Sequence, residues 1–346
     1  LWTTSPNPRV GCVLVRDGGI VGEGWHEKAG EPHAEVHALH AAGDKAHGAT
    51  AYVTLEPCSH HGRTPPCAEA LIAAGVSRVV AAMTDPNPLV AGQGLALLQA
   101  ADIETASGLL ENEARELNIG FVSRMTRGRP WLRLKAAASL DGKTALNNGV
   151  SQWITGPDAR RDGHAWRARA CAILTGIGTV RDDNPQLNVR DVETPRQPLR
   201  VVVDSRLEAP LDARILQGGT TLIAGAVEDA GRIEALRSVG AEVLILPNAS
   251  GKVDLAALLT ALGGRGVNEV HAEAGFKLNG SLLREGLVDE LLLYLAPCLI
   301  GHEANGLFNL PELATLDGKR RLQIRDLRQI GADIRVVARP VNSEPR

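Results

Sequence analysis

Aromatic residues are scarce in this chain of 346 residues, because Phe, Trp and Tyr together make up only 3% of it. The apolar residues make up 44% and are mainly Ala, Leu and Val. This composition favours α/β domains over a β-sandwich or β-barrel. A large charge of one sign is also lacking, since the net charge is −3 and the pI about 6.4. A general attraction to nucleic acid or to an anionic membrane is therefore excluded.

The sequence contains no apolar run long enough to span a bilayer and no signal-peptide pattern. Its five cysteines are odd in number, which argues against a disulfide framework and for a reducing, cytoplasmic location. We interpret Cys12, Cys171 and Cys298 as small buried hydrophobic residues. The chain opens at Leu1 without Met, so we expect some native N-terminal residues to be missing.

The length suggests two domains. Strand-like and helix-like runs alternate almost throughout, with strands expected at residues 10–15, 51–56 and 78–83 in the first part. Such alternation predicts largely parallel sheets whose ligands bind at the carboxyl ends of the strands. The basic stretch with Gly and Pro at residues 124–131 is the best linker. We therefore place the two domains at residues 1–126 and 127–346.

Four residues in the first part carry a strong chemical signal, namely His33, Glu35, Cys58 and Cys67 in the segments PHAEVHALH and TLEPCSHHGRTPPCAEA. One imidazole and two thiolates can hold a zinc ion and leave its fourth position open for water. A glutamate two residues after the histidine can take a proton from that water and pass it to a leaving amine. H-x-E followed by P-C and a second Cys is the arrangement of zinc deaminases that act on nucleobase-like rings.

The spacing places each ligand at the end of a predicted element. Residues i and i+2 do not face each other on a regular helix, so His33 and Glu35 can serve one site only at a helix N-terminus, which Pro32 marks. Cys58 follows a predicted strand. Cys67 opens a helix that we expect to run for three turns, and the helix dipole there would stabilise its thiolate.

A closed structural zinc site is the alternative, because His60 and His61 lie between the two cysteines and could provide a fourth protein ligand. Two thiolates cancel the charge of Zn²⁺, so the bound water is acidified less than at a site of three histidines. Glu35 must then act as general base, and Glu35→Gln should keep the zinc and abolish turnover.

The second part gives weaker signals. A G-x-G-x-x-G motif after the first strand is absent, so the ordinary dinucleotide fingerprint is missing. Glycine-containing turns at residues 175–190 and 273–283 follow predicted strands, where helix N-termini could hold phosphate. Arginines, which suit bidentate phosphate contacts, are concentrated nearby: Arg160, Arg161, Arg167, Arg169, Arg181 and Arg190. These features predict a phosphorylated ligand such as a nucleotide.

Longer motifs run along nearly the whole chain. The first part contains TSPNPRVGCVLV (4–15), GEPHAEVHAL (30–39) and AYVTLEPCSHHGRTPPCAEALI (51–72). The second contains KAAASLDGKTA (135–145), SQWITG (151–156) and VDELLLYLAP (288–297). With these motifs the sequence resembles the bifunctional deaminase/reductase family of bacterial riboflavin biosynthesis. The resemblance implies an N-terminal cytidine-deaminase-like three-layer α/β/α domain and a C-terminal dihydrofolate-reductase-like α/β domain.

The resemblance also implies two reactions. The first is zinc-hydroxide deamination of 2,5-diamino-6-ribosylamino-4(3H)-pyrimidinone 5′-phosphate, with Glu35 as the catalytic residue. The second is reduction of 5-amino-6-(5-phosphoribosylamino)uracil to the ribitylamino product by NADPH, whose preference over NADH rests on the resemblance alone. The implied cofactors are zinc and NADPH. We expect phosphorylated pyrimidines as partners, no nucleic acid or membrane, and a homo-oligomer, either a dimer or a tetramer.

Site residues are implied by motif. The deaminase substrate would be bound by Asn7, His26, His60 and Arg63. Substrate-side positions of the reductase would be Lys135, Ser151, Arg167, Leu187, Arg190 and Glu273. NADPH-side positions would be Ala137, Trp153, Thr179, Asp183, Ser205, Gly275, Phe276, Lys277, Leu278, Asn279, Gly280 and Ser281. Either Lys135 or Asp183 would supply or orient the proton, and the sequence does not choose between them.

Two other functions stay open at this point. One is a nucleic-acid-editing deaminase with an accessory domain, against which the net charge and the few aromatic residues for base stacking both count. The other is a zinc-stabilised regulatory protein whose second half only senses a nucleotide. Binding of NADPH without its oxidation would indicate this second alternative.

Overall fold

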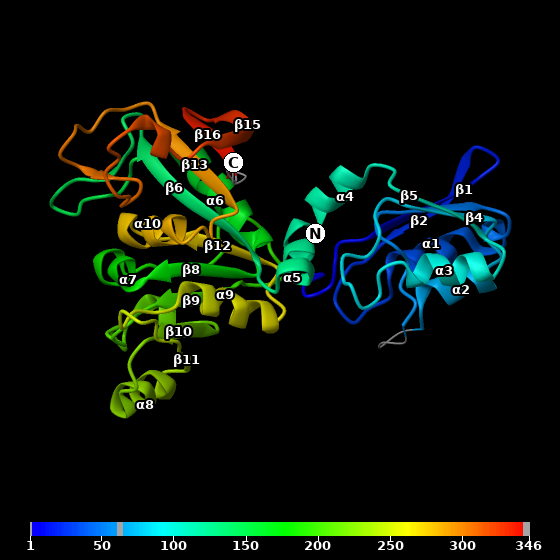
Figure 1. Ribbon diagram of the computed structural model, residues 1–346, viewed down its shortest axis with the longest axis horizontal. Helices are drawn as coiled ribbons and strands as arrows, with labels where there is room; N and C mark the ends of the chain where they lie inside the picture. Colours follow the sequence, from blue (N-terminus) through cyan, green and yellow to red (C-terminus); the bar gives the residue numbers. More distant parts are fainter. Residues whose placement is uncertain (1, 61–64, 342–346) are drawn as a thin grey trace. The chain divides into compact units, whose positions relative to one another are not determined.

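The computed structural model describes residues 2–60 and 65–341. The chain folds into two compact units, Leu1–Arg129 and Pro130–Arg346 (Figure 1). Each unit has its own central sheet and its own apolar core.

The first unit is built on a five-stranded sheet in the order β2-β1-β3-β4-β5. Strand β1 is antiparallel to β2 and β3, whereas β3, β4 and β5 run parallel. The strands are β1 (Gly11–Arg16), β2 (Gly19–Trp25), β3 (Thr50–Val53), β4 (Arg78–Ala81) and β5 (Glu104–Ser107). The helices are α1 (Ala34–Ala42), the 3₁₀ turn η1 (Gly43–Ala46), α2 (Cys67–Ala73), α3 (Gln93–Ala100), α4 (Glu111–Leu117) and α5 (Ile119–Arg127).

Helix α1 packs directly on strand β2 because two glycines of the strand present no side chain. A Cβ atom on Gly24 would lie 2.6 Å from the Ala34 oxygen and 2.5 Å from the Cβ of His37. A Cβ atom on Gly22 would lie 2.3 Å from the Ala38 oxygen. The buried core between the sheet and helices α1, α2 and α3 includes Leu14, Ala38, Leu71, Val79 and Leu98. The start of α1 is thereby held tightly against the sheet.

Two helix ends differ from the sequence expectation. Helix α2 has seven residues rather than three turns, and Gly75 follows it with a φ of 66°, a left-handed conformation that favours glycine. Helix α5 continues to Arg127, into the stretch expected to be a linker from residue 124, and ends at Gly128 with a φ of 69°. In both places the chain leaves the helix where a glycine tolerates the turn.

The second unit contains a nine-stranded sheet in the order β11-β10-β9-β8-β12-β6-β13-β16-β15. The strands are β6 (Trp131–Ser139), β8 (Ala172–Gly176), β9 (Leu199–Val203), β10 (Thr221–Gly225), β11 (Ala241–Ile245), β12 (Glu269–Glu273), β13 (Glu290–Ala296), β15 (Leu322–Ile330) and β16 (Asp333–Pro340). The sheet is parallel, as the alternating pattern predicts, except that β16 pairs antiparallel with β13 and β15. Strands β7 (Lys143–Ala145) and β14 (Asn305–Gly306) form a separate pair.

The helices of this unit are α6 (Pro157–Arg169), α7 (Ile177–Asp183), α8 (Ala230–Ser238), α9 (Leu255–Gly264) and α10 (Phe276–Arg284), with 3₁₀ turns η2 (Arg214–Leu216) and η3 (Leu316–Gly318). One core cluster joins the sheet to α9 and α10 through residues such as Leu134, Leu258 and Leu282. Another contains Ile173, Val202 and Leu236. The central strands are thus packed with apolar side chains and hold their carboxyl ends in fixed positions.

Ion pairs join α6 to the strands near it, beside an apolar cluster in which Ala159 of the helix packs with Leu292 and Val337. The guanidinium of Arg133, 2% exposed, donates to Glu290 Oε1 at 2.6 Å and lies 3.3 Å from Glu269 Oε2. Arg169 of α6 donates to Glu269 at 2.8 Å, and the Arg133 guanidinium lies 4.4 Å from the Trp166 ring centroid. Such a buried network is held only while all its members are present.

Candidate functional site

In the first unit, His33, Cys58 and Cys67 are brought together from three separate segments. His33 precedes α1 as its N-cap, Cys58 follows β3, and Cys67 is the first residue of α2. The His33 Nδ1 atom lies 3.6 Å from Cys58 Sγ and 3.3 Å from Cys67 Sγ. Tetrahedral zinc with ordinary bond lengths would place nitrogen and sulfur ligands about 3.6 Å apart. The three residues therefore fit a zinc ion.

A fourth protein ligand would close such a site. Among the residues that the structure describes, the group whose ligand atoms converge has only these three members. His60 is exposed and does not belong to the group, whereas His61 lies outside the described residues. The described part of the chain therefore leaves one coordination position for a small molecule.

The thiols of the two cysteines are electrostatically unequal. A hydrogen bond from Cys67 and the neighbouring His33 ring lower the pKa of Cys58 to about 4, although burial opposes the shift. The same contact with Cys58, together with burial, raises the pKa of Cys67. The Cys67 amide also donates to Cys58 Sγ at 3.3 Å.

Glu35 lies in the first turn of α1 and is only 3% exposed. Its Oε2 atom has no hydrogen-bond partner among the described residues, and burial raises the pKa of the carboxyl group. A buried carboxylate oxygen without a partner is costly and calls for an explanation. A ligand or water molecule at the metal position would give Oε2 a partner.

A short hydrogen-bonded chain lies beside the metal ligands. The His26 ring is 5.2 Å from the His33 ring, and burial lowers the pKa of His26. Its Nδ1 lies 3.1 Å from the Pro32 oxygen, so this nitrogen carries the proton, and Nε2 accepts from Asn7 Nδ2 at 3.2 Å. The structure therefore brings Asn7 and His26 to the metal position. Arg63 lies outside the described residues.

Sequence reasoning missed Glu56, which directly precedes the Pro57–Cys58 pair. Its buried carboxylate accepts hydrogen bonds from the backbone amides of Asp85, Gly92, Gly94 and Leu95, at 2.8 to 3.3 Å. These contacts tie the segment after β4 to the Cys58 loop. An acidic residue at the end of an apolar strand was the only available signal in the sequence.

Cys298 also differs from expectation, because it is exposed rather than buried.

In the second unit a cavity of about 1110 Å³ lies at the carboxyl ends of the central strands. It is lined by every substrate-side residue that the family motifs suggested: Lys135, Ser151, Arg167, Leu187, Arg190 and Glu273. Most of the suggested cofactor-side residues line it as well: Ala137, Trp153, Thr179, Asp183, Gly275, Phe276, Lys277, Leu278 and Asn279. Residues from six separate segments thus surround one space.

Three suggested cofactor residues do not line this cavity. The Ser205 hydroxyl accepts a hydrogen bond from the Val253 amide at 3.1 Å. Gly280 packs against the Asn309 backbone, where a Cβ atom would lie 2.2 Å from the oxygen. The Ser281 hydroxyl accepts from Arg284 at 2.8 Å. In this structure, Ser205 and Ser281 make local hydrogen bonds, and Gly280 allows a close approach of two backbone segments.

Charged residues are paired on one wall of the cavity. Arg167 binds Glu273 side-on through Nε and Nη2, the latter at 2.9 Å, and Lys135 Nζ lies 3.6 Å from Glu273 Oε2. Burial alone would raise the pKa of Glu273, but Arg167 and Lys135 hold it well below its ordinary value. Glu273 therefore stays ionised and keeps both cations in place.

His164 was not named by the sequence analysis, whereas Asp183 was named there as a cofactor-side residue and a candidate proton donor. His164 is 4% exposed, accepts from the Arg190 amide at 3.4 Å and lies 3.2 Å from Asp191 Oδ2. Burial, then Arg167 and Arg190, lower the pKa of His164 to about 4. Asp183 accepts from Ser151 at 3.4 Å, and burial raises its pKa.

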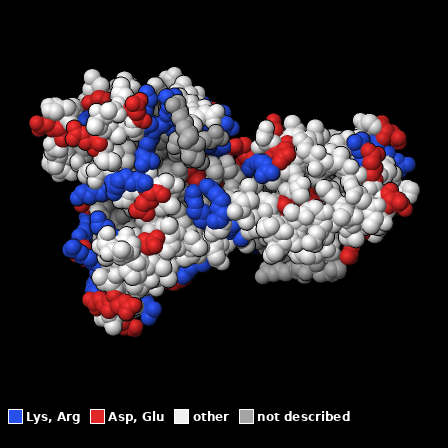
Figure 2. All heavy atoms as spheres, in the orientation of Figure 1, with Lys and Arg blue, Asp and Glu red and all other residues white. Residues whose placement is uncertain are grey.

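Figure 2 shows Lys and Arg side chains interspersed with acidic ones on the second unit, whereas much of the visible face of the first unit carries neither. Within the residues described, no helix combines the length and apolarity needed to cross a membrane.

The fold and the metal ligands of the first unit are those of a zinc-binding deaminase, and a reductase domain follows it. Residues 2–83 match the cytidine and deoxycytidylate deaminase zinc-binding region, and residues 130–336 match the RibD C-terminal domain. The chain belongs to the RibD family of riboflavin-biosynthesis proteins, in which a deaminase domain is joined to a reductase domain.

Relatives cover nearly the whole chain. The riboflavin biosynthesis protein RibD of Escherichia coli K12 is 51% identical over 96% of this chain and 93% of its own length. A structure of RibD from Acinetobacter baumannii is 46% identical, with a TM-score of 0.92 over 99% of this chain and 94% of that one. The diaminohydroxyphosphoribosylaminopyrimidine deaminase/5-amino-6-(5-phosphoribosylamino)uracil reductase of Thermotoga maritima is 32% identical, with a TM-score of 0.87 over 99% and 94%. The fold expected from the resemblance is confirmed.

Proposed function

We propose that the first domain deaminates 2,5-diamino-6-ribosylamino-4(3H)-pyrimidinone 5′-phosphate and that the second uses NADPH to reduce the resulting 5-amino-6-(5-phosphoribosylamino)uracil. The observation that carries the proposal is the convergence of His33, Cys58 and Cys67 beside the unpartnered Oε2 of Glu35. The Thermotoga maritima relative, named for both reactions, supports the choice of substrates. We propose the functional division at residues 126/127, in the last turn of α5.

In the deamination, His33, Cys58 and Cys67 would hold the zinc ion, which would supply Lewis acidity to a water molecule at its open position. Glu35 takes a proton at Oε2 and delivers it to the departing amino group, which leaves as ammonia. The Asn7–His26–Pro32 chain fixes the pyrimidine, because Asn7 gives Nδ2 to His26 and keeps Oδ1 for the substrate. His60 and Arg63 complete the substrate contacts.

In the reduction, the cavity of the second domain holds the ribosyl phosphate against the nicotinamide. Arg167 and Arg190 supply positive charge for the substrate, and Glu273 keeps Arg167 and Lys135 in position. NADPH supplies the hydride. Lys135 supplies the proton, because its ammonium lies inside the cavity and is paired only loosely, at 3.6 Å, with Glu273. The second candidate is Asp183, whose raised pKa also suits a proton donor.

Single substitutions separate the two reactions. Cys67→Ala should abolish ammonia release from the diaminopyrimidine while the enzyme still oxidises NADPH when given the uracil product. Lys135→Met should do the reverse. If Lys135→Met kept its NADPH oxidation and Asp183→Asn lost it, the proton would come from Asp183. Loss of both reactions in a folded Cys67→Ala variant would refute the assignment of one reaction to each domain.

We also propose a cytoplasmic homo-oligomer. The edge strand β15 supports association, because its Ile324 and Leu327 are 60% and 62% exposed. Light scattering after size-exclusion chromatography should give two or four times the mass of 36.6 kDa. A single-chain mass at micromolar concentration would contradict this part of the proposal.

A further inference from the structure

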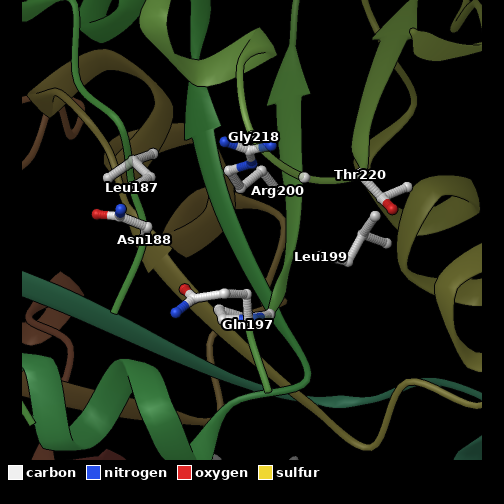
Figure 3. A pocket seen from close by; sticks show the side chains of 9 residues that line it. Leu187, Asn188, Gln197, Leu199, Arg200, Gly218 and Thr220 are labelled. Carbon is white, nitrogen blue, oxygen red and sulfur yellow. The ribbon is translucent and has the colours of Figure 1, made fainter. Parts of the chain in front are cut away.

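A second, smaller cavity of about 410 Å³ in the reductase domain lies at the amino ends of β9 and β10, away from the strand ends that line the large cavity. Figure 3 shows Arg200 at its centre, beside Gly218, with Leu187 and Asn188 on one wall and Leu199 and Thr220 on another. None of the residues proposed above to bind NADPH lines it.

Arg200 is a buried cation without a counter-charge. Its side chain is 4% exposed, and none of the described carboxylates is paired with it. The Nη1 atom donates to the Gln217 oxygen at 2.7 Å. The Nη2 atom is buried and has no hydrogen-bond partner among the described residues. An unpaired buried charge is strongly destabilising, so a partner is expected.

The unused edge of Arg200 has the geometry that binds an oxyanion. In the same domain, Arg167 uses its Nε and Nη2 atoms to hold the two oxygens of Glu273. In Arg200, Nη1 is used by the Gln217 oxygen, and the buried Nη2 of the other edge has no acceptor in the part of the chain described. The Gly219 backbone lies against Nη2, since a Cβ atom at this position would be 2.9 Å from it, so a larger residue here would press on the guanidinium. A carboxylate or phosphate oxygen would supply the acceptor that this edge lacks.

We propose that this cavity binds a small organic molecule through a carboxylate or phosphate group that pairs with the Nε–Nη2 edge of Arg200. One guanidinium balances one negative charge, and the Thr220 hydroxyl can add a donor. Leu187 on one wall and Leu199 on the other provide apolar surface for the body of the ligand.

The cavity shares a wall with the proposed substrate site. Leu187 lines both cavities, and the Asn188 oxygen accepts from Arg167 at 3.1 Å. The Gln197 side chain holds both the amide and the oxygen of Val189, at 2.8 and 2.9 Å. A ligand beside Arg200 would therefore contact residues 187–188, whose other side faces the large cavity and accepts a hydrogen bond from Arg167. This consequence rests on the proposed function, whereas the binding site itself does not.

Calorimetry of the full-length protein with benzoate tests the site. The matched neutral probe is benzamide, and inorganic phosphate distinguishes the two anionic groups. Benzoate or phosphate should bind, benzamide should not, and binding should weaken about ten- to hundredfold in Arg200→Gln. Thr220→Trp, which fills the cavity from an exposed position, should have the same effect without removing a buried residue. Arg190→Gln is the control, because it removes an arginine of the large cavity only.

The proposal is overturned if neither anion binds, if benzamide binds as well as benzoate, or if both variants retain the affinity of the parent protein. Saturation with the anion that binds should also change the reductase KM for the uracil substrate and leave kcat unchanged. An unchanged KM would refute the coupling through residues 187–190, while failure of the reductase reaction itself would not affect the calorimetric result.

Discussion

The close approach of α1 to β2 makes Gly24 a sharp test of how the fold positions the zinc site. In Gly24→Ala the new Cβ atom would lie 2.6 Å from the Ala34 oxygen, whereas ordinary contact begins near 3.4 Å. Helix α1 would therefore have to retreat by roughly 0.8 Å, and overpacking of this kind costs about 1–3 kcal/mol. His33 and Glu35 would move with the helix, since they flank its first residue.

We expect Gly24→Ala to lower the rate of ammonia release by about 10- to 100-fold, because a shift near 1 Å is enough to misplace reacting groups. The melting temperature of the deaminase domain should fall by roughly 3–10 °C. NADPH oxidation with supplied uracil substrate should be unchanged, since the reductase is a separate compact unit.

Gly19→Ala is the matched control for this experiment. Gly19 lies in the same strand, and a Cβ atom there would meet nothing closer than the Arg16 oxygen at 3.7 Å. Zinc content, ammonia release and thermal melting should be measured on both variants. If Gly24→Ala behaved like Gly19→Ala in all three, the claim that α1 holds the site through glycine contact would be wrong.

Three further predictions concern single residues. Glu35→Gln should retain zinc by elemental analysis but lose ammonia release by at least about 10²- to 10⁴-fold, and loss of the metal instead would contradict its role as proton carrier. Arg133→Met should destabilise the reductase domain by about 3 kcal/mol in urea unfolding, because it breaks two buried ion pairs, although Arg339 and Arg169 still pair with Glu290 and Glu269. Arg265→Met, at an exposed pair, should change stability by less than about 1 kcal/mol. The pKa of His164 falls from 6.5 to about 4 on folding, so its contribution to stability is complete above pH 6.5 and is lost as the pH falls toward 4. His164→Gln should make this acid-dependent loss of reductase-domain stability shallower, and an unchanged pH profile would show that the neutral ring does not stabilise the fold.

The sequence alone was sufficient to predict sites whose chemistry requires particular residue types. His33, Cys58 and Cys67 were identifiable because a metal needs particular donors at element ends, and the structure brings these donors together. Parallel strand order followed from the alternation of strands and helices for most of both sheets. The antiparallel pairings of β1 with β2 and β3, and of β16 with β13 and β15, give no separate signal in that pattern.

What the sequence did not show depends on contacts between distant segments. Glu56 gains its role only because four backbone amides from residues 85–95 fold over it. The length of α2 was overestimated, since an apolar run does not reveal that Gly75 will adopt a left-handed φ. The ion pairs of Arg133 join residues more than a hundred positions apart. In the sequence Arg200 is indistinguishable from other strand residues, and only the structure shows that its Nη2 atom has no partner among the described residues.

The most direct test of the account is a single time course with the zinc-loaded wild-type protein, NADPH and the diaminopyrimidine ribotide, in which ammonia and NADPH absorbance are followed together. The account predicts ammonia first and then loss of NADPH in equal amount. Ammonia without NADPH oxidation would contradict the reductase assignment. No ammonia from an intact zinc-loaded protein would contradict the proposed deaminase substrate.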